Sequence, residues 1–143
     1  MRVAILVAAV SETNGISQLQ IAERARAANH LIETDGSSQA GGSRSLEQTV
    51  TPTLAFPLEH FPPPTVLKMD AEGAELKALR GASKLLLVVR PVIWCEVAPE
   101  NAVSVGELLC EAGYHIYAAA LPPDKRTPLQ RASWATLAVP MRS

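Results

Sequence analysis

One stretch decides the fold, and it begins with Thr65-Val66-Leu67-Lys68-Met69-Asp70, a short apolar strand that ends in an acid. Apolar residues then recur at helical spacing from Ala74 to Val89, so a helix follows this strand. Gly81 interrupts the helix or divides it into two short ones. Arg90-Pro91 ends it, because the residue before a proline is driven out of the α region. The stretch therefore predicts a strand that feeds a helix.

The residues that follow repeat this alternation. They predict a second buried strand over Val92 to Val97, a helix over Ala102 to Glu111 that ends at Gly113, a strand over Tyr114 to Ala119 and a last strand over Ser133 to Val139. Strands that alternate with helices form βαβ units, which build a mostly parallel, doubly wound sheet. We therefore expect an α/β fold.

The N-terminal half carries weaker patterns. Val3 to Val10 is an unbroken apolar run, which is typical of a strand buried on both faces in a parallel sheet. Ile16 to Ala22 partly alternates and indicates a short strand or one arm of a hairpin. Glu23 to Leu46 is polar and rich in glycine and serine, which predicts a long loop. Gln48 to Leu54 indicates an edge strand, where Pro52 is tolerated.

The composition limits the classes of function. The 143 residues are 48% hydrophobic and 19% charged, the balance of one soluble globular domain. The net charge of −1 argues against the basic footprint that nucleic-acid binding requires, and no apolar run approaches the roughly 20 residues of a membrane span. Cys95 and Cys110 show neither zinc-site spacing nor a disulfide framework, which favours a reducing, cytoplasmic setting. Arg2 and the apolar run after it also resemble a weak signal peptide, although Asn14-Gly15 suits the end of a strand better.

Acids gather where the first predicted strand of the informative half ends. Asp70 closes the strand, and Glu72 and Glu75 follow in the turn and the first helical turn. Ligands of such sheets bind at the carboxyl ends of the strands, so these acids are the first candidates for a site. Glu72 and Glu75 could equally be acids that favour the positive end of the helix. Asp70 needs a partner or a ligand, because a carboxylate directly after a buried strand is costly when unpaired.

Two further charged residues lie on the predicted strands. Glu96 stands inside the apolar strand Val92 to Val97, where burial without a partner would raise its pKa or cost free energy. It is either held by a lysine or by backbone N–H groups, or it is a second carboxylate in the same cleft as Asp70. Lys68 lies two residues before Asp70 and therefore on the same face, which makes it the obvious ion-pair partner when no ligand is present.

These residues also carry a resemblance to a known family. Lys68-Met69-Asp70-Ala71-Glu72-Gly73-Ala74-Glu75, followed by Gly81-Ala82 and later by Arg90-Pro91-Val92-Ile93-Trp94-Cys95-Glu96-Val97, resembles the signature of FkbM-type methyltransferases. The resemblance is good from Val66 to Val97 and weak before Thr49. It implies a class I, Rossmann-like fold, S-adenosylmethionine as the methyl donor, and O-methylation of a hydroxyl on a sugar or another small metabolite.

The resemblance also implies roles for individual residues. Asp70 would lie near the transferring methyl group, and Glu72 or Glu75 would bind or deprotonate the substrate hydroxyl, so these three acids are the predicted catalytic residues. No metal is expected. The remaining assignments are substrate binding by Lys68 and Glu96 and cofactor binding by Ala9, Val10 and Asp70.

The chain departs from the family pattern in two places. Family members carry a glycine-rich turn and a ribose-binding acid ahead of the strand that Val3 to Val10 resembles, and nothing before Met1 supplies them. We therefore expect a member truncated at its N-terminus, with a strand and turn at 1–22, a variable loop region at 23–64 and a βαβ core at 65–143. The missing neighbours would leave a strand edge open to self-association. Ala55 stands where the family commonly has an acid.

Two other classes of function stay open. One is a non-catalytic remnant, or a partner protein that completes its sheet by pairing an exposed strand edge with another polypeptide. The other is an enzyme in which Asp70, Glu72 and Glu96 hold a divalent cation through oxygen ligands. Concentration-dependent oligomerisation would support the first class, and stabilisation by magnesium would support the second.

Overall fold

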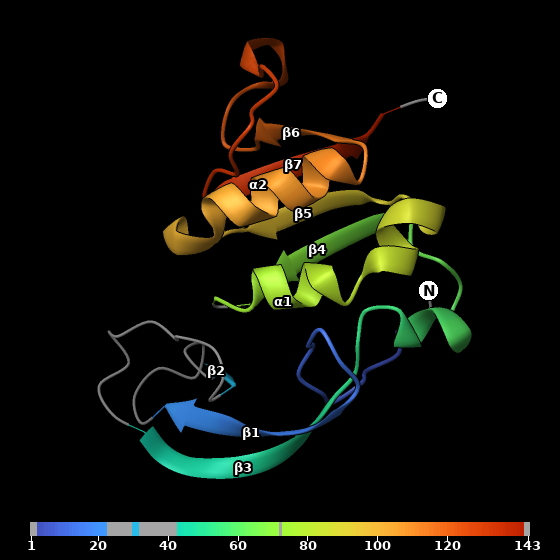
Figure 1. Ribbon diagram of the computed structural model, residues 1–143, viewed down its shortest axis with the longest axis vertical. Helices are drawn as coiled ribbons and strands as arrows, with labels where there is room; N and C mark the ends of the chain where they lie inside the picture. The colour runs from blue at the N-terminus through green and yellow to red at the C-terminus, as the bar shows by residue number, and fades with distance from the viewer. Residues whose placement is uncertain (1–2, 23–29, 32–42, 72, 142–143) are drawn as a thin grey trace.

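A computed structural model describes residues 3–22, 30–31, 43–71 and 73–141, arranged as two sheets and a layer of helices (Figure 1). The elements in chain order are β1 (Gly15–Ala22), β2 (His30–Leu31), β3 (Ser43–Thr51), the 3-10 turn η2 (Phe56–Glu59), β4 (Val66–Asp70), α1 (Glu75–Arg80), the π-helical turn η3 (Leu85–Val89), β5 (Val92–Glu96), the 3-10 turn η4 (Pro99–Asn101), α2 (Ala102–Glu111), β6 (Tyr114–Ala118), the 3-10 turn η5 (Pro123–Lys125) and β7 (Ala135–Pro140).

The larger sheet has four strands in the order β4-β5-β7-β6. β4 and β5 are parallel, while β7 runs antiparallel to both β5 and β6, so β4, β5 and β6 share one direction. The predicted α/β alternation from residue 65 onward is confirmed, but the sheet is mixed. The connection from β6 to β7 is the difference: residues 119–134 contain a 3-10 turn and no α-helix, whereas a parallel return usually crosses the sheet through a helix.

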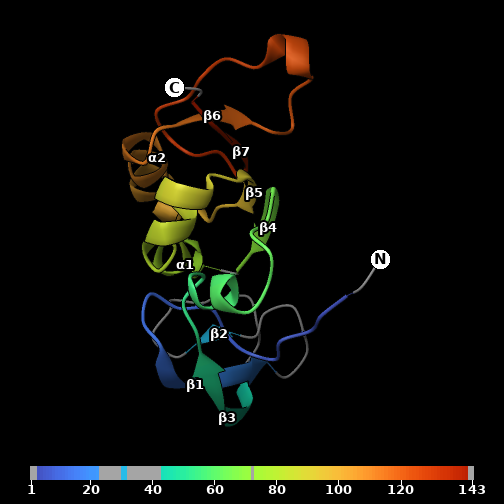
Figure 2. The ribbon, with the colours of Figure 1, turned by 90° about the vertical axis from the view of Figure 1, so that its right-hand side faces the viewer.

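Both α-helices lie on the same face of this sheet, as the two views show (Figures 1 and 2). Residues of one parity on the strands point to the helices and are buried, among them Met69, Ile93 and Cys95. Residues of the other parity face away from the helices, and there Trp94 is 49% exposed. The strand Val92 to Val97 is therefore buried on one face only. The doubly wound sheet expected from the sequence would carry helices on both faces, and the described helices cover only one of them (Figures 1 and 2).

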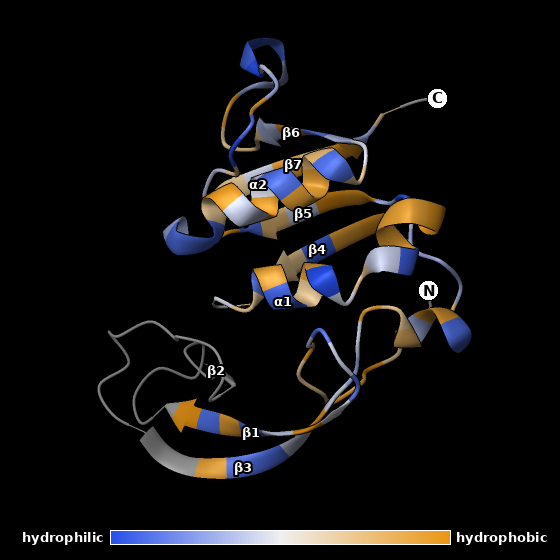
Figure 3. Ribbon diagram, in the orientation of Figure 1, coloured by the Kyte–Doolittle hydropathy of each residue, from blue (hydrophilic) through white to orange (hydrophobic). Residues whose placement is uncertain are grey.

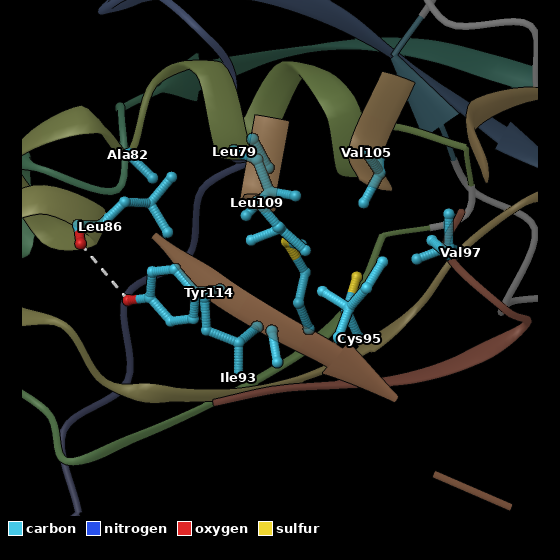
Figure 4. Packing of buried hydrophobic residues seen from close by; sticks show 14 of the residues in the cluster. Leu79, Ala82, Leu86, Ile93, Cys95, Val97, Val105, Leu109 and Tyr114 are labelled. Atoms are coloured by element: carbon cyan, nitrogen blue, oxygen red, sulfur yellow. Dashed lines mark hydrogen bonds between the residues drawn. The ribbon is translucent and has the colours of Figure 1, made fainter. Parts of the chain in front are cut away.

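The core fills the space between the sheet and the helices (Figure 4). Leu79, Leu109 and Ile93 are each at most 1% exposed. Tyr114 is equally buried, and its hydroxyl donates a hydrogen bond of 3.4 Å to the carbonyl oxygen of Leu86. This bond gives the phenol the partner that a buried hydroxyl requires and ties β6 to the π-helical turn.

The predicted break at Gly81 is confirmed, since α1 ends at Arg80. A Cβ atom on Gly81 would lie 2.5 Å from the carbonyl oxygen of Ser11, so only glycine allows the N-terminal segment to pack this closely. The predicted stop at Arg90 is also confirmed: this residue has a φ of 54°, in the left-handed region. Its guanidinium lies 5.5 Å from the centre of the Tyr114 ring and donates hydrogen bonds to the carbonyl oxygens of Ala112, Gly113 and Met141.

The N-terminal half forms a separate antiparallel sheet in the order β2-β1-β3. The strand predicted over Ile16 to Ala22 is confirmed as β1. The predicted edge strand Gln48 to Leu54 is confirmed as the edge strand β3, although it starts at Ser43 and ends at Thr51, before the proline. Most of the predicted loop over Glu23 to Leu46 lies outside the described residues. Polar and apolar residues are interspersed along β1 and β3, and no described helix covers them (Figure 3).

The prediction of a buried strand over Val3 to Val10 is wrong. The described part of this run is extended but belongs to no strand, and the side chains of Ile5 and Val7 are 86% and 89% exposed. Only its end is anchored, by hydrogen bonds from the N–H of Ala9 to Val50 and from the N–H of Ser11 to Pro52. An apolar run becomes a buried strand only where neighbouring strands satisfy its backbone, and among the described residues this run is hydrogen-bonded to β3 only at Ala9.

Candidate active site

The parallel register of β4 and β5 brings the two predicted carboxylates of the strands side by side. Asp70 is the register partner of Glu96, and both stand at the carboxyl ends of their strands. Asp70 is exposed and Glu96 is half-buried, on the sheet face opposite the helices. The arrangement gives one edge of the sheet a pair of adjacent acids, as expected for a ligand site at the strand ends.

Glu75 lies in a different setting, at the start of α1. Its carboxyl group is buried, with the residue only 2% exposed. The N–H of Gly73 donates a hydrogen bond of 2.8 Å to Oε1 of Glu75, and Nδ2 of Asn101 donates one of 3.1 Å to Oε2. The same Nδ2 donates a bond of 3.0 Å to the carbonyl oxygen of Gly73. Both oxygens of the carboxylate are therefore engaged by the protein.

The pKa of the Cys95 thiol is affected by the acids of this region. The pKa of Cys95 is raised from 9.0 to about 12, first by burial and then by the negative charges of Glu75, Asp70 and Glu96. The thiol also donates a weak hydrogen bond of 3.5 Å to the carbonyl oxygen of Glu96. Three acids therefore lie close enough to act on one buried thiol, at the carboxyl ends of β4 and β5 and the start of α1.

The other predicted site residues are less closely associated. Lys68 is exposed on the same face as Asp70, but the described residues show no ion pair between Lys68 and either Asp70 or Glu96. The ion pair expected in the absence of a ligand is therefore not formed. Ala9 is fixed by its N–H to Val50, and Val10 packs against the core. Glu72, the third predicted catalytic acid, lies outside the described residues.

Asn101 is the residue that sequence reasoning missed. It directly precedes the predicted helix α2, where an asparagine is ordinarily interpreted as a helix cap. Its side chain makes no capping hydrogen bond and instead reaches the loop between β4 and α1. The available signal was an asparagine just before a predicted helix. Its distant hydrogen-bond partners are set by the fold and not by any local pattern.

Metal and membrane sites find no support in the described part of the chain. Among those residues, no group of three or more His, Cys, Asp or Glu side chains is placed to hold a metal ion. Likewise, no described helix has the length and apolar character needed to cross a membrane. The divalent-cation hypothesis relied on Glu72, which lies outside the described residues, so it gains nothing from the geometry seen.

Two apolar pockets lie away from the acids. One, of about 280 Å³, lies between the N-terminal segment and β3, and the other, of about 350 Å³, lies between the α1–η3 region and α2. Neither contains Asp70, Glu75 or Glu96. The first is lined by Leu6, Val7, Ala8, Asn14, Gly15, Val50, Thr51, Pro52 and Phe56, and the second by Leu79, Arg80, Ser83, Leu86, Leu87, Leu108, Glu111 and Ala112.

Comparison with known proteins identifies the family. The family model described as the methyltransferase FkbM domain matches residues 3–116, a range that includes Asp70, Glu75 and Glu96. No curated protein and no solved structure matches the chain. The mixed sheet with few helices is consistent with an incomplete methyltransferase-like fold. Because the match covers most of the sequence, the chain belongs to the FkbM methyltransferase domain family.

Proposed function

We propose that this protein is an S-adenosylmethionine-dependent O-methyltransferase that acts on a hydroxyl of a sugar or another small metabolite. The observation that carries the proposal is the FkbM match over residues 3–116, which contains the acids at the ends of β4 and β5. The negative charge of the site supports the fit of the cofactor. Asp70, Glu75 and Glu96 make this region electronegative, and S-adenosylmethionine carries a positive sulfonium.

The residues of the site would divide the work. When bound, S-adenosylmethionine supplies the methyl group. The exposed carboxylate of Asp70 would stabilise positive charge at the ligand, and Glu96 beside it would complete the polar wall. Glu72 or Glu75 would bind the substrate hydroxyl or accept its proton, since a carboxylate within hydrogen-bond reach is a suitable general base. Lys68, on the same face of the sheet as Asp70, would bind an oxygen atom of the substrate that accepts the methyl group. Ala9 and Val10 would contact the cofactor.

The proposal is tested by ligand binding. A ligand at 100 times its Kd stabilises a protein by about 2.7 kcal/mol. Titration of the full chain with S-adenosylmethionine should therefore raise the Tm by several degrees. Asp70→Asn should weaken binding about tenfold or more, because it removes a charge at the ligand. Glu107→Gln removes an exposed acid of α2 and is the matched control, with unchanged binding expected. No shift in Tm and no methyl transfer to any hydroxyl acceptor would refute the proposal.

A second candidate is a non-catalytic partner protein. Two observations favour it: β4 stands at the edge of its sheet among the described strands, and the apolar side chains of Val3 to Val7 are exposed. An open edge and an extended apolar segment are the two halves of a strand-addition contact. We also propose a cytoplasmic location, since both cysteines, Cys95 and Cys110, are free.

A further inference from the structure

A hydrogen-bonded link joins two loops at the carboxyl ends of β4 and β5. The loop after β4 contributes the N–H and the carbonyl of Gly73, α1 contributes the carboxylate of Glu75, and the turn before α2 contributes the amide of Asn101. The three bonds measure 2.8, 3.0 and 3.1 Å. They close a ring of contacts across 28 residues of sequence, between segments that no strand pairing connects.

The link controls the backbone just after Asp70. Gly73 has a φ of 93°, a left-handed conformation that glycine adopts without strain. The turn made here sets the direction of the chain between Asp70 and α1, and the link holds both polar backbone groups of Gly73. The position of Gly73, between β4 and α1, therefore depends on two side chains, Glu75 and Asn101.

The chemistry of the amide fits this task. A single Nδ2 carries two N–H donors, and in the structure one meets Oε2 of Glu75 and the other meets the carbonyl oxygen of Gly73. A carboxylate at the same position would donate nothing and would repel Glu75. The amide is also not used for helix capping, because Asn101 makes no side-chain bond to the N-terminus of α2. Its bonds serve the loop after β4.

We infer that Asn101 is a positioning residue of the site, which holds Glu75 and Gly73 and through them the loop that follows Asp70. Glu75 acts with it, since both oxygens of its buried carboxylate are occupied by the protein. Among the described acids of the site, those left to face a substrate are then Asp70 and Glu96. This inference rests on the proposed methyltransferase function, and it deepens that function by separating acids that hold the loop from acids that meet the ligand.

The first measurement does not need activity. Hydrogen exchange at the Gly73 amide should be slow in the wild-type chain and at least tenfold faster in Asn101→Ala, because the carboxylate that holds this N–H loses its own support. Asn14→Ala is the matched control: Oδ1 of Asn14 accepts a bond of 2.8 Å from the N–H of Thr53, also far away in sequence. Its Gly73 exchange should match the wild type. Unchanged exchange in Asn101→Ala would overturn the inference whether or not the chain binds S-adenosylmethionine.

The second measurement separates positioning from simple stability. At a temperature where all variants are folded, Asn101→Ala should lower kcat at least tenfold while the Kd for S-adenosylmethionine changes less than threefold, because a displaced loop misaligns reacting groups. Asn101→Asp should lower kcat at least as much as Asn101→Ala, because the new carboxylate donates no hydrogen bond and repels Glu75. An unchanged kcat in Asn101→Ala would overturn the inference. A wild-type chain that neither binds nor transfers would refute the proposed function instead, while Gly73 exchange still decides the link.

A third variant tests Glu75 itself. Glu75→Gln keeps the shape of the side chain and one acceptor oxygen, so a positioning role predicts a loss in kcat of less than tenfold. If Glu75 is the general base, the same variant should lose 100-fold or more, because the amide accepts no proton. A loss of that size, with Gly73 exchange unchanged, would restore Glu75 as the catalytic acid and overturn its positioning role.

Discussion

The two sheets of this protein differ in what covers them, and among the described residues only the sheet of β4, β5, β7 and β6 holds a core. In the sheet of β4, β5, β7 and β6, the inward residues pack under α1 and α2 (Figure 4). In the sheet of β2, β1 and β3, Ile16 is 73% exposed, and no described residue of these strands belongs to the core cluster. Strands pair into a sheet in both regions, but among the described residues a buried core appears only where helices supply a second layer. The candidate site lies in the region with the core.

The largest expected effect compares how much each of the two sheets contributes to the free energy of unfolding. Leu109→Ala removes a fully buried side chain from the core and should lower the free energy of unfolding by about 2–5 kcal/mol. Ile16→Ala, in β1, should change it by less than about 0.5 kcal/mol, because its side chain faces solvent. Urea unfolding monitored by circular dichroism measures both. Equal losses would mean that the N-terminal sheet carries as much of the stability as the core does.

The second prediction uses the buried thiol. The pKa of Cys95 is raised to about 12 in the folded chain, so the unfolded chain loses this proton first as the pH rises. The contribution of the neutral thiol is complete below pH 9 and is lost between pH 9 and 12, at up to about 1.4 kcal/mol per pH unit. Burial also raises the pKa of Tyr114, which adds a loss of the same sign.

Variants assign this alkaline loss to one thiol. Cys95→Ala should flatten the fall of unfolding free energy with pH, whereas Cys110→Ala, at the partly exposed free cysteine, should keep the wild-type slope. Comparing slopes removes the separate cost of the cavity in Cys95→Ala. Chemical unfolding at pH 8, 9, 10 and 11 gives the slopes. Parallel curves for the wild type and Cys95→Ala would contradict the assignment.

The third prediction concerns the junction of the two regions. Gly81→Ala would place a Cβ atom 2.5 Å from the carbonyl oxygen of Ser11 and should cost about 1–3 kcal/mol, because backbone must move to make room. Gly15→Ala is the matched control, since the new Cβ atom would lie 3.6 Å from Oγ1 of Thr51, an ordinary contact. Faster hydrogen exchange at the Ser11 amide should accompany the Gly81 variant. Equal stability of the two variants would show that the close contact is absent in solution.

The sequence predicts the two regions unequally well, for physical reasons. From residue 65 onward, local signals set the element boundaries: Gly81 breaks the helix, Arg90-Pro91 ends it and Gly113 ends the next. The pairing of Asp70 with Glu96 follows from the parallel register of two short strands. The position of Val3 to Val10 could not be predicted, because an apolar run does not show which strand, if any, pairs with it. The antiparallel direction of β7 and the hydrogen bonds of Asn101 to Gly73 and Glu75 could not be predicted either, because they depend on residues distant in sequence.

The smallest expected effect is an association between copies of the chain. We propose that the exposed segment Val3 to Val7 of one copy adds to the edge of β4 in another, because no described strand pairs with that edge and an exposed apolar segment can complete it. Sedimentation velocity should show a dimer whose fraction rises with protein concentration. Ile5→Lys should lower that fraction, because it places a charge in the new strand.

Leu121→Lys is the control for this association. It also adds a charge at an exposed leucine, but in the β6–β7 connection, far in sequence from both contact surfaces. It should leave the dimer fraction unchanged. A wild-type chain that stays monomeric at all concentrations would contradict the proposal, and equal loss of dimer in both variants would assign the contact to charge and not to β4. A dimer lost only in Ile5→Lys would show that the N-terminal region, which contributes little to the core, contributes the contact between copies.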